Sequence, residues 1–179
     1  MQIRRATRED GSAVVELIRC LAEFESLPPP DAEAEARLLR DAFDRAPPRL
    51  EVWVAVDHDD DGDGDGDGDR DGDRAITGTG TASGRRERVI AYAACFECYS
   101  TFRARPTLFL EDLFVHPSAR RRGVASRMLA LLRDEALRRG CGRFEWFVLA
   151  WNEDAKSLYR AVGAEIIPDW QLCRVDLQP

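Results

Sequence analysis

A basic, glycine-containing turn is the first feature of the sequence that could do chemistry. Residues 108–115 form a near-continuous apolar run, and Arg120-x-x-Gly123-x-Ala125 follows where a helical pattern begins. Small residues let a bound group approach the backbone, and N–H groups in the first turn of a helix favour an anion. The neighbouring arginines add positive charge, so the turn suits a pyrophosphate. An ordinary helix start with a basic, solvated turn is the alternative for this pattern alone.

Two adjacent carboxylates interrupt the apolar run that precedes this turn. Glu111 and Asp112 lie midway along residues 108–115, and strand alternation predicts them on opposite faces. Buried carboxylates are costly unless they are paired, so each needs an arginine or a cationic substrate. A protonated alkylamine has a pKa near 10.4 and must lose a proton before it attacks at neutral pH. The pair is therefore consistent with an amine site.

A tyrosine in the last third of the chain could supply a proton. Tyr159 shares a helical stripe with Ala155, Leu158 and Val162. A phenol can act as a general acid, but a tyrosine on such a stripe is also an ordinary core residue. The pattern alone leaves both interpretations open.

The elements that would position these residues alternate between helix and strand. Apolar spacing predicts helices after Thr7, over residues 31–45, from about 124 to 139 and after an Asn152 cap. Strand patterns cover residues 51–56, 89–96, 108–115, 144–149, 166–167 and 172–177. This order predicts an α/β fold with a mixed central sheet flanked by helices.

An Asp- and Gly-rich segment interrupts the strand patterns at about residues 57–86. Residues 57–74 hold ten Asp and two Arg and so carry a net charge of −8. The whole chain has a net charge of −7, so the remaining residues together carry +1. Strand-like sequence resumes at Val89, so we predict a disordered loop inserted into a single domain of residues 1–179. EF-hand registers with Gly at position 6 place Gly68 or Gly72 where Glu is needed, which favours a solvated spacer.

Composition excludes several other classes of protein. Hydrophobic residues make up 44% of the 179 residues, and no apolar run approaches the roughly 20 residues of a membrane span. No signal-peptide pattern begins the chain, so we expect a cytoplasmic protein without a membrane partner. Five scattered cysteines do not suggest a disulfide framework; Cys95 and Cys98, which form a C-x-x-C, are interpreted as core residues, and we expect no metal. The dispersed arginines do not indicate a nucleic-acid partner.

The basic turn resembles the acetyl-CoA-binding motif of the GNAT acetyltransferase family, whose pattern is Gln/Arg-x-x-Gly-x-Gly/Ala. The wider sequence is similar to diamine (spermidine/spermine) N-acetyltransferases and thialysine N-acetyltransferases over nearly the whole chain except the Asp/Gly-rich segment. The matching motifs, in order, are LAEFESL (21–27), CYST (98–101), LEDLFV (110–115), RRGVAS (121–126), WNEDAKSLYRAVGA (151–164) and Trp170-x-Leu172.

The resemblance implies a GNAT fold and a role for each matching residue. Tyr159 would protonate the departing thiolate, and Glu111 would help to remove a proton from the amine, directly or through water. The residues implied to contact acetyl-CoA are Leu113, Phe114, Val115, Arg121, Arg122, Gly123, Val124, Ala125, Ser126, Asn152 and Ala155. The residues implied at the acceptor amine are Phe24, Glu25, Glu111, Asp112 and Trp170.

The resemblance predicts an N-acetyltransferase that transfers acetyl from acetyl-CoA directly to a primary amine. Thialysine, a lysine-like amino acid, and a di- or polyamine are the expected acceptors, and a homodimer is expected because relatives usually form one. Arg103 and Arg105 stand where the polyamine enzymes carry an acid and a Trp; they would receive a substrate carboxylate and repel the far cation of spermine. The alternatives are a protein lysine or N-terminal acetyltransferase, and a non-catalytic acyl-CoA-binding or acidic calcium-responsive module.

Overall fold

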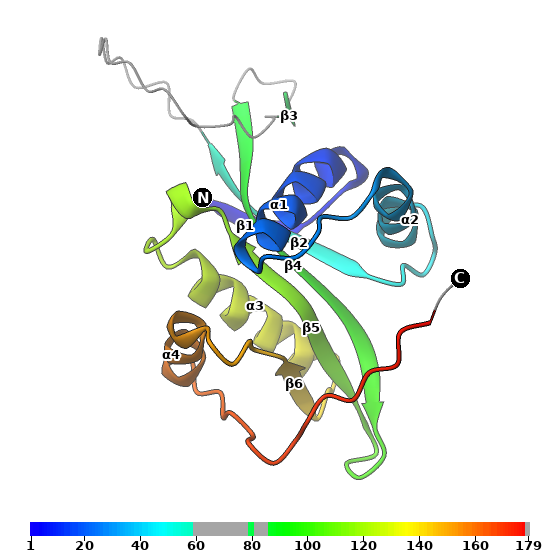
Figure 1. Cartoon of the computed structure of the whole chain (residues 1–179), viewed down its shortest axis with the longest axis vertical. Coiled ribbons are helices and arrows are strands. Elements are labelled where there is room, and N and C mark those ends of the chain that lie inside the picture. The colour runs from blue at the N-terminus through cyan, green and yellow to red at the C-terminus, as the bar shows by residue number, and fades with distance from the viewer. Residues whose placement is uncertain (59–78, 81–85, 178–179) are drawn as a thin grey trace. The chain divides into compact units, whose positions relative to one another are not determined.

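The computed structural model describes residues 1–58, 79–80 and 86–177, which fall into two compact units, Met1–Phe147 and Val148–Pro179. The first unit is built on a mixed sheet of strand order β1-β2-β4-β5-β6, with β3 paired to β4 outside this order (Figure 1). Neighbouring strands are antiparallel except β5 and β6, which are parallel. The strands are β1 Gln2–Arg5, β2 Glu51–His58, β3 Thr79–Gly80, β4 Arg86–Ser100, β5 Arg105–Val115 and β6 Arg143–Trp146.

Helices cover the sheet of the first unit, and one further helix lies in the second unit. The helical segments are η1 Arg8–Asp10, α1 Gly11–Phe24, α2 Ala32–Phe43, η2 Pro117–Ala119, α3 Val124–Arg138 and α4 Glu153–Ala161. The predicted α/β class with a mixed sheet flanked by helices is therefore confirmed.

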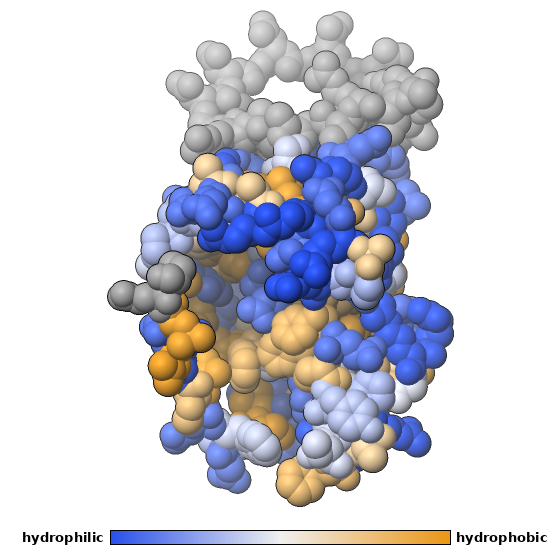
Figure 2. Space-filling view, turned by 90° about the vertical axis from the view of Figure 1, so that its right-hand side faces the viewer, coloured by the Kyte–Doolittle hydropathy of each residue, from blue (hydrophilic) through white to orange (hydrophobic). Residues whose placement is uncertain are grey.

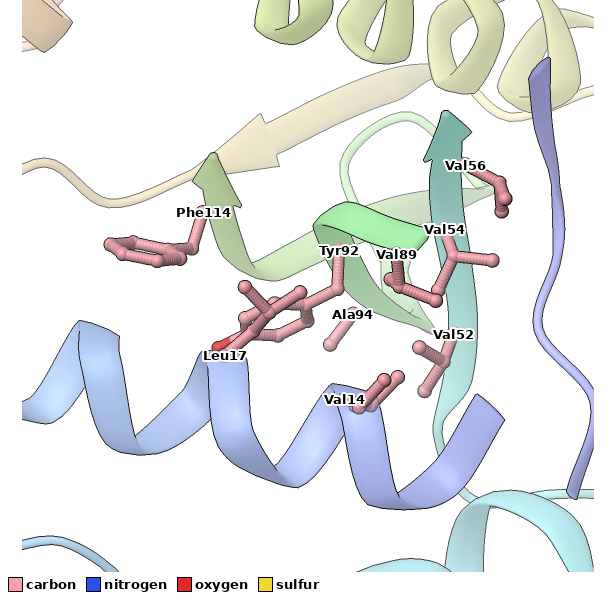
Figure 3. Close-up of a cluster of buried hydrophobic side chains, with 10 residues drawn as sticks. Val14, Leu17, Val52, Val54, Val56, Val89, Tyr92, Ala94 and Phe114 are labelled. Atoms are coloured by element: carbon pink, nitrogen blue, oxygen red, sulfur yellow. The ribbon is translucent and has the colours of Figure 1, made fainter. Parts of the chain in front are cut away.

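Helix α1 packs an apolar stripe against one face of the sheet. Val14 and Leu17 are buried and point toward the strands, and Tyr92 belongs to the same buried cluster (Figure 3). Residues three or four apart share one side of a helix, which is why the apolar spacing predicted this element. Truncating a buried leucine such as Leu17 to alanine is expected to cost ~2–5 kcal/mol of folding free energy.

Helix α3 covers the other face of the sheet. Tyr92 and Ala94 belong to the cluster under α1, so Ala93 and Cys95, which alternate with them along β4, face the opposite way. Both of these residues are fully buried, as is Met128 of α3. The sheet thus has an apolar core on each face, which fixes β4 and β5 between two helices.

A buried carboxylate ties the first strand to the start of α1. Arg4 Nη1 donates to Asp10 Oδ2 at 2.7 Å and Arg4 Nη2 donates to Asp10 Oδ1 at 2.9 Å. The Thr7 N–H also donates to Asp10 Oδ2 at 2.7 Å, and Asp10 is only 1% exposed. Burial alone would raise the pKa of Asp10, but these hydrogen bonds outweigh it and hold the pKa below its ordinary value.

The second unit contains helix α4 and an extended tail. The Asn152 side chain accepts a hydrogen bond from the Ala155 N–H at 3.1 Å, so Asn152 caps this helix as predicted. The strands predicted at residues 166–167 and 172–177 do not occur among the described residues of this unit, and that prediction is wrong. An apolar pattern becomes a strand only where another strand pairs with it, and the pattern itself does not supply the partner.

The predicted insertion at residues 57–86 lies mostly outside the described residues. Its described parts belong to strands: Asp57 and His58 end β2, Thr79–Gly80 form β3, and Arg86 begins β4. His58 pairs with Glu87, so the two long strands meet directly at the base of the insertion.

Candidate active site

Strand β5 carries two adjacent carboxylates at a break in its pairing with β4. Ala94 of β4 lies opposite Asp112. The next residue of β4, Cys95, lies opposite Leu110, so Glu111 is the extra residue of a β-bulge. Because cross-strand partners share a face, Asp112 faces α1 and Leu110 faces α3. Regular alternation therefore breaks between Leu110 and Asp112, and Glu111 is exposed while Asp112 is half-buried.

A tyrosine from the neighbouring strand holds Asp112. The fully buried Tyr92 donates its hydroxyl to Asp112 Oδ2 at 3.2 Å. Burial is the largest influence on the carboxyl and raises its pKa, the tyrosine hydrogen bond opposes this rise, and the charges of Glu111 and Glu25 add to it. Together they raise the pKa of Asp112 to about 6. Burial and the Asp112 charge also raise the pKa of Tyr92, so the phenol remains the hydrogen-bond donor.

The end of α1 brings a third carboxylate to this region. Glu25 is the C-cap of α1, and partial burial raises its pKa. Its charge acts on both Tyr92 and Asp112, so it lies near that pair. Glu25, Glu111 and Asp112 were all predicted at the acceptor amine, and the structure brings these three carboxyl groups together.

An arginine and two aromatic rings lie beside the carboxylates. The Arg120 Cζ is 5.2 Å from the ring centroid of Phe24 and 5.5 Å from that of Phe114. Arg120 Nε also donates to the Val115 carbonyl at 3.1 Å. Phe24, predicted to contact the acceptor, is 40% exposed at the end of α1. A cation over an aromatic face is attracted to it, so Arg120 links the end of α1 to the end of β5.

The last residues of β5 lie at an edge without a second neighbour. Parallel pairing with β6 covers Thr107 to Leu110 of β5 and ends there. Among the described residues, β5 then continues to Val115 with β4 on one side and no strand on the other. Backbone groups along residues 111–115 therefore present an edge to which an extended ligand can pair. Leu113, Phe114 and Val115, the residues predicted to meet the pantetheine arm, form this edge.

The turn before α3 has the backbone geometry of an anion site. Gly123 caps the helix with a φ of 74°, and Arg121 has a φ of 60°. Glycine adopts such a left-handed conformation without strain. A Cβ added at Gly123 would meet nothing within 4 Å, so the backbone is open to an approaching group. The N–H groups of Val124, Ala125 and Ser126 lie in the first helical turn, where a helix supplies no acceptor for them.

One arginine of this turn is paired with a carboxylate. Arg122 Nη1 lies 2.7 Å from Asp57 Oδ2 at the end of β2. That hydrogen bond holds the pKa of Asp57 below its ordinary value, so the carboxylate stays charged. Arg121 and Arg122 are both exposed. Helix N–H groups, an open glycine and exposed guanidinium groups fit the pyrophosphate of acetyl-CoA, and the contacts themselves stay a prediction.

The remaining predicted residues belong to the second unit. Tyr159 lies in α4 and is half-buried. Ala155, predicted to contact acetyl-CoA, donates its N–H to the Asn152 side chain. Trp170 lies in the tail after α4 and is 79% exposed. The roles predicted for these four residues stay predictions.

Arg103 and Arg105 lie at the far end of β5 from the carboxylates. Arg105 begins the strand and Arg103 precedes it in the turn that follows β4. Arg105 and Glu111 are six positions apart along the strand, a backbone span of about 20 Å. The carboxylate-receiving role of the two arginines stays a prediction.

Figure 2 shows one face of the molecule, with hydrophobic residues gathered over its lower part.

Tyr92 is the functional candidate that sequence analysis missed. In the sequence it is one residue of an apolar strand, and its hydroxyl gains a role only when the strand register is known. It lies opposite Phe114 and reaches the diagonal neighbour Asp112. The available signal was an aromatic hydroxyl and a carboxylate in successive apolar strands.

The described part of the chain has neither a candidate metal cluster nor a candidate membrane-spanning helix. Residues 1–58, 79–80 and 86–177 contain no group of three or more His, Cys, Asp or Glu side chains that could hold a metal ion. Over the same ranges, each helix is too short or too polar to cross a membrane.

Known proteins resemble this chain in sequence. Residues 51–164 match the Acetyltransferase (GNAT) family. The thialysine N-epsilon-acetyltransferase of Bos taurus is 30% identical over 167 residues, which cover 92% of this chain and 84% of that protein. The L-ornithine N5-acetyltransferase NATA1 of Arabidopsis thaliana is 33% identical over 87 residues; these cover 49% of this chain and only 38% of that protein.

Solved structures share the fold at low sequence identity. A probable acetyltransferase superposes with a TM-score of 0.72 at 16% identity and covers 100% of this chain and 99% of its own. AAC(6')-Iy, solved with the bisubstrate analogue CoA-S-monomethyl-acetylneamine, has a TM-score of 0.66 at 19% identity and covers 98% of each chain. The family match spans well over half of the chain, and the sheet, its open edge and the turn before α3 agree with it: the chain belongs to the GNAT acetyltransferase family.

Proposed function

We propose that the protein transfers the acetyl group of acetyl-CoA to the primary amine of a small amino acid such as thialysine, ornithine or another lysine-like molecule. Small diamines are further acceptors in this proposal, and the long polyamine spermine is a weaker one. The names of the relatives support it, since one acetylates thialysine at Nε and another acetylates ornithine at N5.

The carboxylates around Asp112 are the observation that carries the proposal. Glu25, Glu111 and Asp112 gather negative charge beside the open edge of β5. A protonated amine is attracted to such a cluster, and its binding would offset the cost of partly burying Asp112. An acetyl donor paired along residues 111–115 would hold its thioester near the same amine.

Three proton movements accompany the transfer. A base takes a proton from the acceptor ammonium, and the freed nitrogen lone pair forms a C–N bond with the thioester carbonyl carbon. The C–S bond breaks, the thiolate departs with the electron pair, an acid protonates it, and the nitrogen loses its second proton to give the neutral amide. We assign the acid role to Tyr159 and the base role to the Glu111–Asp112 pair, with direct transfer and no acetyl-enzyme.

The donor side of the site uses backbone groups and charge. The edge of residues 113–115 would pair with the pantetheine arm, and the α3 N–H groups after Gly123 would bind the pyrophosphate, with Arg121 and Arg122 adding positive charge. Asn152 and Ala155, at the start of α4, are assigned to the cofactor. Phe24 and Trp170 are assigned to the acceptor. Bound acetyl-CoA supplies the activated acetyl group.

Turnover of a small panel of amines tests the proposal. The release of CoA would be measured with thialysine, ornithine, spermine and a lysine-containing peptide. We expect thialysine or ornithine to have the highest kcat/KM, and thialysine acetylated at its side-chain amine, the matched control, to give only background hydrolysis. A clear preference for spermine would contradict the amino-acid assignment, and a preference for the peptide would favour a protein acetyltransferase.

A further inference from the structure

Glu111 and Asp112 are neighbours in β5, but their surroundings differ. Glu111 bulges out of the ladder and is exposed. Asp112 stays in register opposite Ala94, faces the α1 core and receives the hydroxyl of Tyr92 at 3.2 Å. A residue held in a ladder and by a buried hydrogen-bond donor has a defined orientation, whereas an exposed bulge residue is less restrained.

We infer that Asp112 is the group that takes the proton from the acceptor amine, and that Tyr92 is a positioning residue that orients the Asp112 carboxylate. The inference deepens the proposed function and rests on it. Glu111, which sequence resemblance assigned to proton removal, instead contributes negative charge that attracts the ammonium.

The proton balance of this step is simple. One proton leaves the ammonium nitrogen for an oxygen of Asp112, which becomes a neutral carboxyl group, and the nitrogen lone pair then forms the C–N bond. As the C–S bond breaks, the thiolate takes a proton from the general acid, and the nitrogen loses its second proton, which restores that acid through solvent and leaves a neutral amide. Asp112 then releases the first proton to solvent, so one ammonium and one thioester give one amide, one thiol and one proton. No oxidant, metal or covalent enzyme intermediate is needed.

The surroundings of Asp112 suit a base that works near neutral pH. The charged and titratable groups that act on it are Tyr92 from β4, Glu111 from β5 and Glu25 from the end of α1. Its pKa is raised from 3.8 to about 6. This change narrows the gap to an ammonium group by about two units, which favours proton transfer about a hundredfold over an ordinary aspartate.

Tyr92 limits the rise in the Asp112 pKa, so its removal should change that pKa in a predictable direction. Its hydrogen bond stabilises the charged carboxylate and lowers the Asp112 pKa, whereas burial and the two glutamates raise it. Removal of the hydroxyl should therefore move the acidic limb of kcat/KM to higher pH. A tyrosine that served only as packing would leave that limb in place when replaced by phenylalanine.

Three variants and a pH profile test the inference. With thialysine as acceptor, wild type should lose kcat/KM below a pH of about 6. Asp112→Asn should lower kcat/KM by about 10²- to 10³-fold and remove this limb. Tyr92→Phe should keep plateau turnover within about fivefold and shift the limb upward by about half a pH unit. Glu111→Gln should raise the KM for the acceptor and keep the acidic limb. The limb should move to lower pH, because the Glu111 charge raises the pKa of Asp112.

Controls separate folding and proposed function from the inference. Asp134→Asn, the same change at an exposed residue of α3, should match wild type, and thermal unfolding with acetyl-CoA calorimetry should show that each variant folds. A limb that survives Asp112→Asn and vanishes in Glu111→Gln would overturn the assignment, and an unmoved limb in Tyr92→Phe would overturn the positioning role. If no amine turns over, the proposed function fails and the base role fails with it. Titration of the Asp112 carboxyl group followed by ¹³C NMR then tests the Tyr92–Asp112 pair without any acceptor. An ordinary Asp112 pKa in wild type would refute the inference.

Discussion

Gly123 offers a direct test of the anion site, because two substitutions there can differ in charge and hardly differ in size. The residue has a φ of 74°, and a Cβ built there meets no atom within 4 Å. Asparagine and aspartate both tolerate this left-handed conformation better than other side chains. Gly123→Asn and Gly123→Asp therefore place side chains of nearly equal size at the same open position, and only the second adds a charge.

The expected difference follows from the charge that the turn is proposed to receive. An added carboxylate about 6 Å from two phosphate charges, at an effective dielectric constant of about 60 for this exposed turn, opposes binding by roughly 2 kcal/mol. That energy corresponds to about a 20- to 30-fold weaker Kd for acetyl-CoA. Both variants should lose at most about 1 kcal/mol of stability, which is about 2–4 °C in Tm for a chain of this size.

Calorimetry with acetyl-CoA at low salt measures this difference. Gly123→Asn should bind within a few fold of wild type, and Gly123→Asp should bind far more weakly. Raising the ionic strength should shrink the gap between the two, because salt screens exposed charges. Equal affinity of the two folded variants would refute the placement of pyrophosphate at this turn.

Three further predictions concern other parts of the chain. Tyr159→Phe should lower kcat by about 10²- to 10⁴-fold with little change in acetyl-CoA affinity, whereas normal turnover with a lower Tm would make Tyr159 a core residue. Deletion of residues 59–73 should leave the Tm and turnover nearly intact, since β2 and β4 already meet at His58 and closure entropy depends weakly on length; calcium-dependent activity of the parent would contradict this. Asp10→Asn should cost about 3 kcal/mol in urea unfolding at pH 7. Because folding lowers the pKa of Asp10, its contribution is present above the unfolded value and is lost as pH falls below about 4, where variant and parent should converge.

Sequence periodicity captured the elements that carry their own signal. The apolar stripe of α3, with Met128 and Leu132 on one side, predicts its helix because spacing of three and four residues has one structural meaning. The cap of α4 was equally local, since Asn152 needs only the N–H of a residue three positions later. Such features depend on neighbours in sequence, and the sequence contains them.

Features that depend on pairing between strands were not predictable in the same way. The bulge at Glu111 exists only relative to Ala94 and Cys95 of β4, so alternation within β5 could not show that Leu110 and Asp112 face opposite ways. Tyr92 was missed for the same reason, because its partner lies twenty residues away in another strand. Resemblance to the family named most residues of the candidate site. The pKa of Asp112 could not be predicted in this way, because it depends on burial and on contacts that only the structure shows.

The bulge also separates the capacity to fold from the capacity to catalyse. The pairs Cys95–Leu110 and Ala94–Asp112 are consecutive along β4, so the ladder would be continuous if Glu111 were absent. Glu111 is in effect a one-codon insertion that the hairpin does not need for its register. Loss of that codon would keep Asp112 opposite Ala94 and the apolar residues on their faces, while it would remove an exposed charge and straighten the strand at the proposed acceptor site. Descendants of such a chain could inherit the fold intact and diverge in the amine they accept.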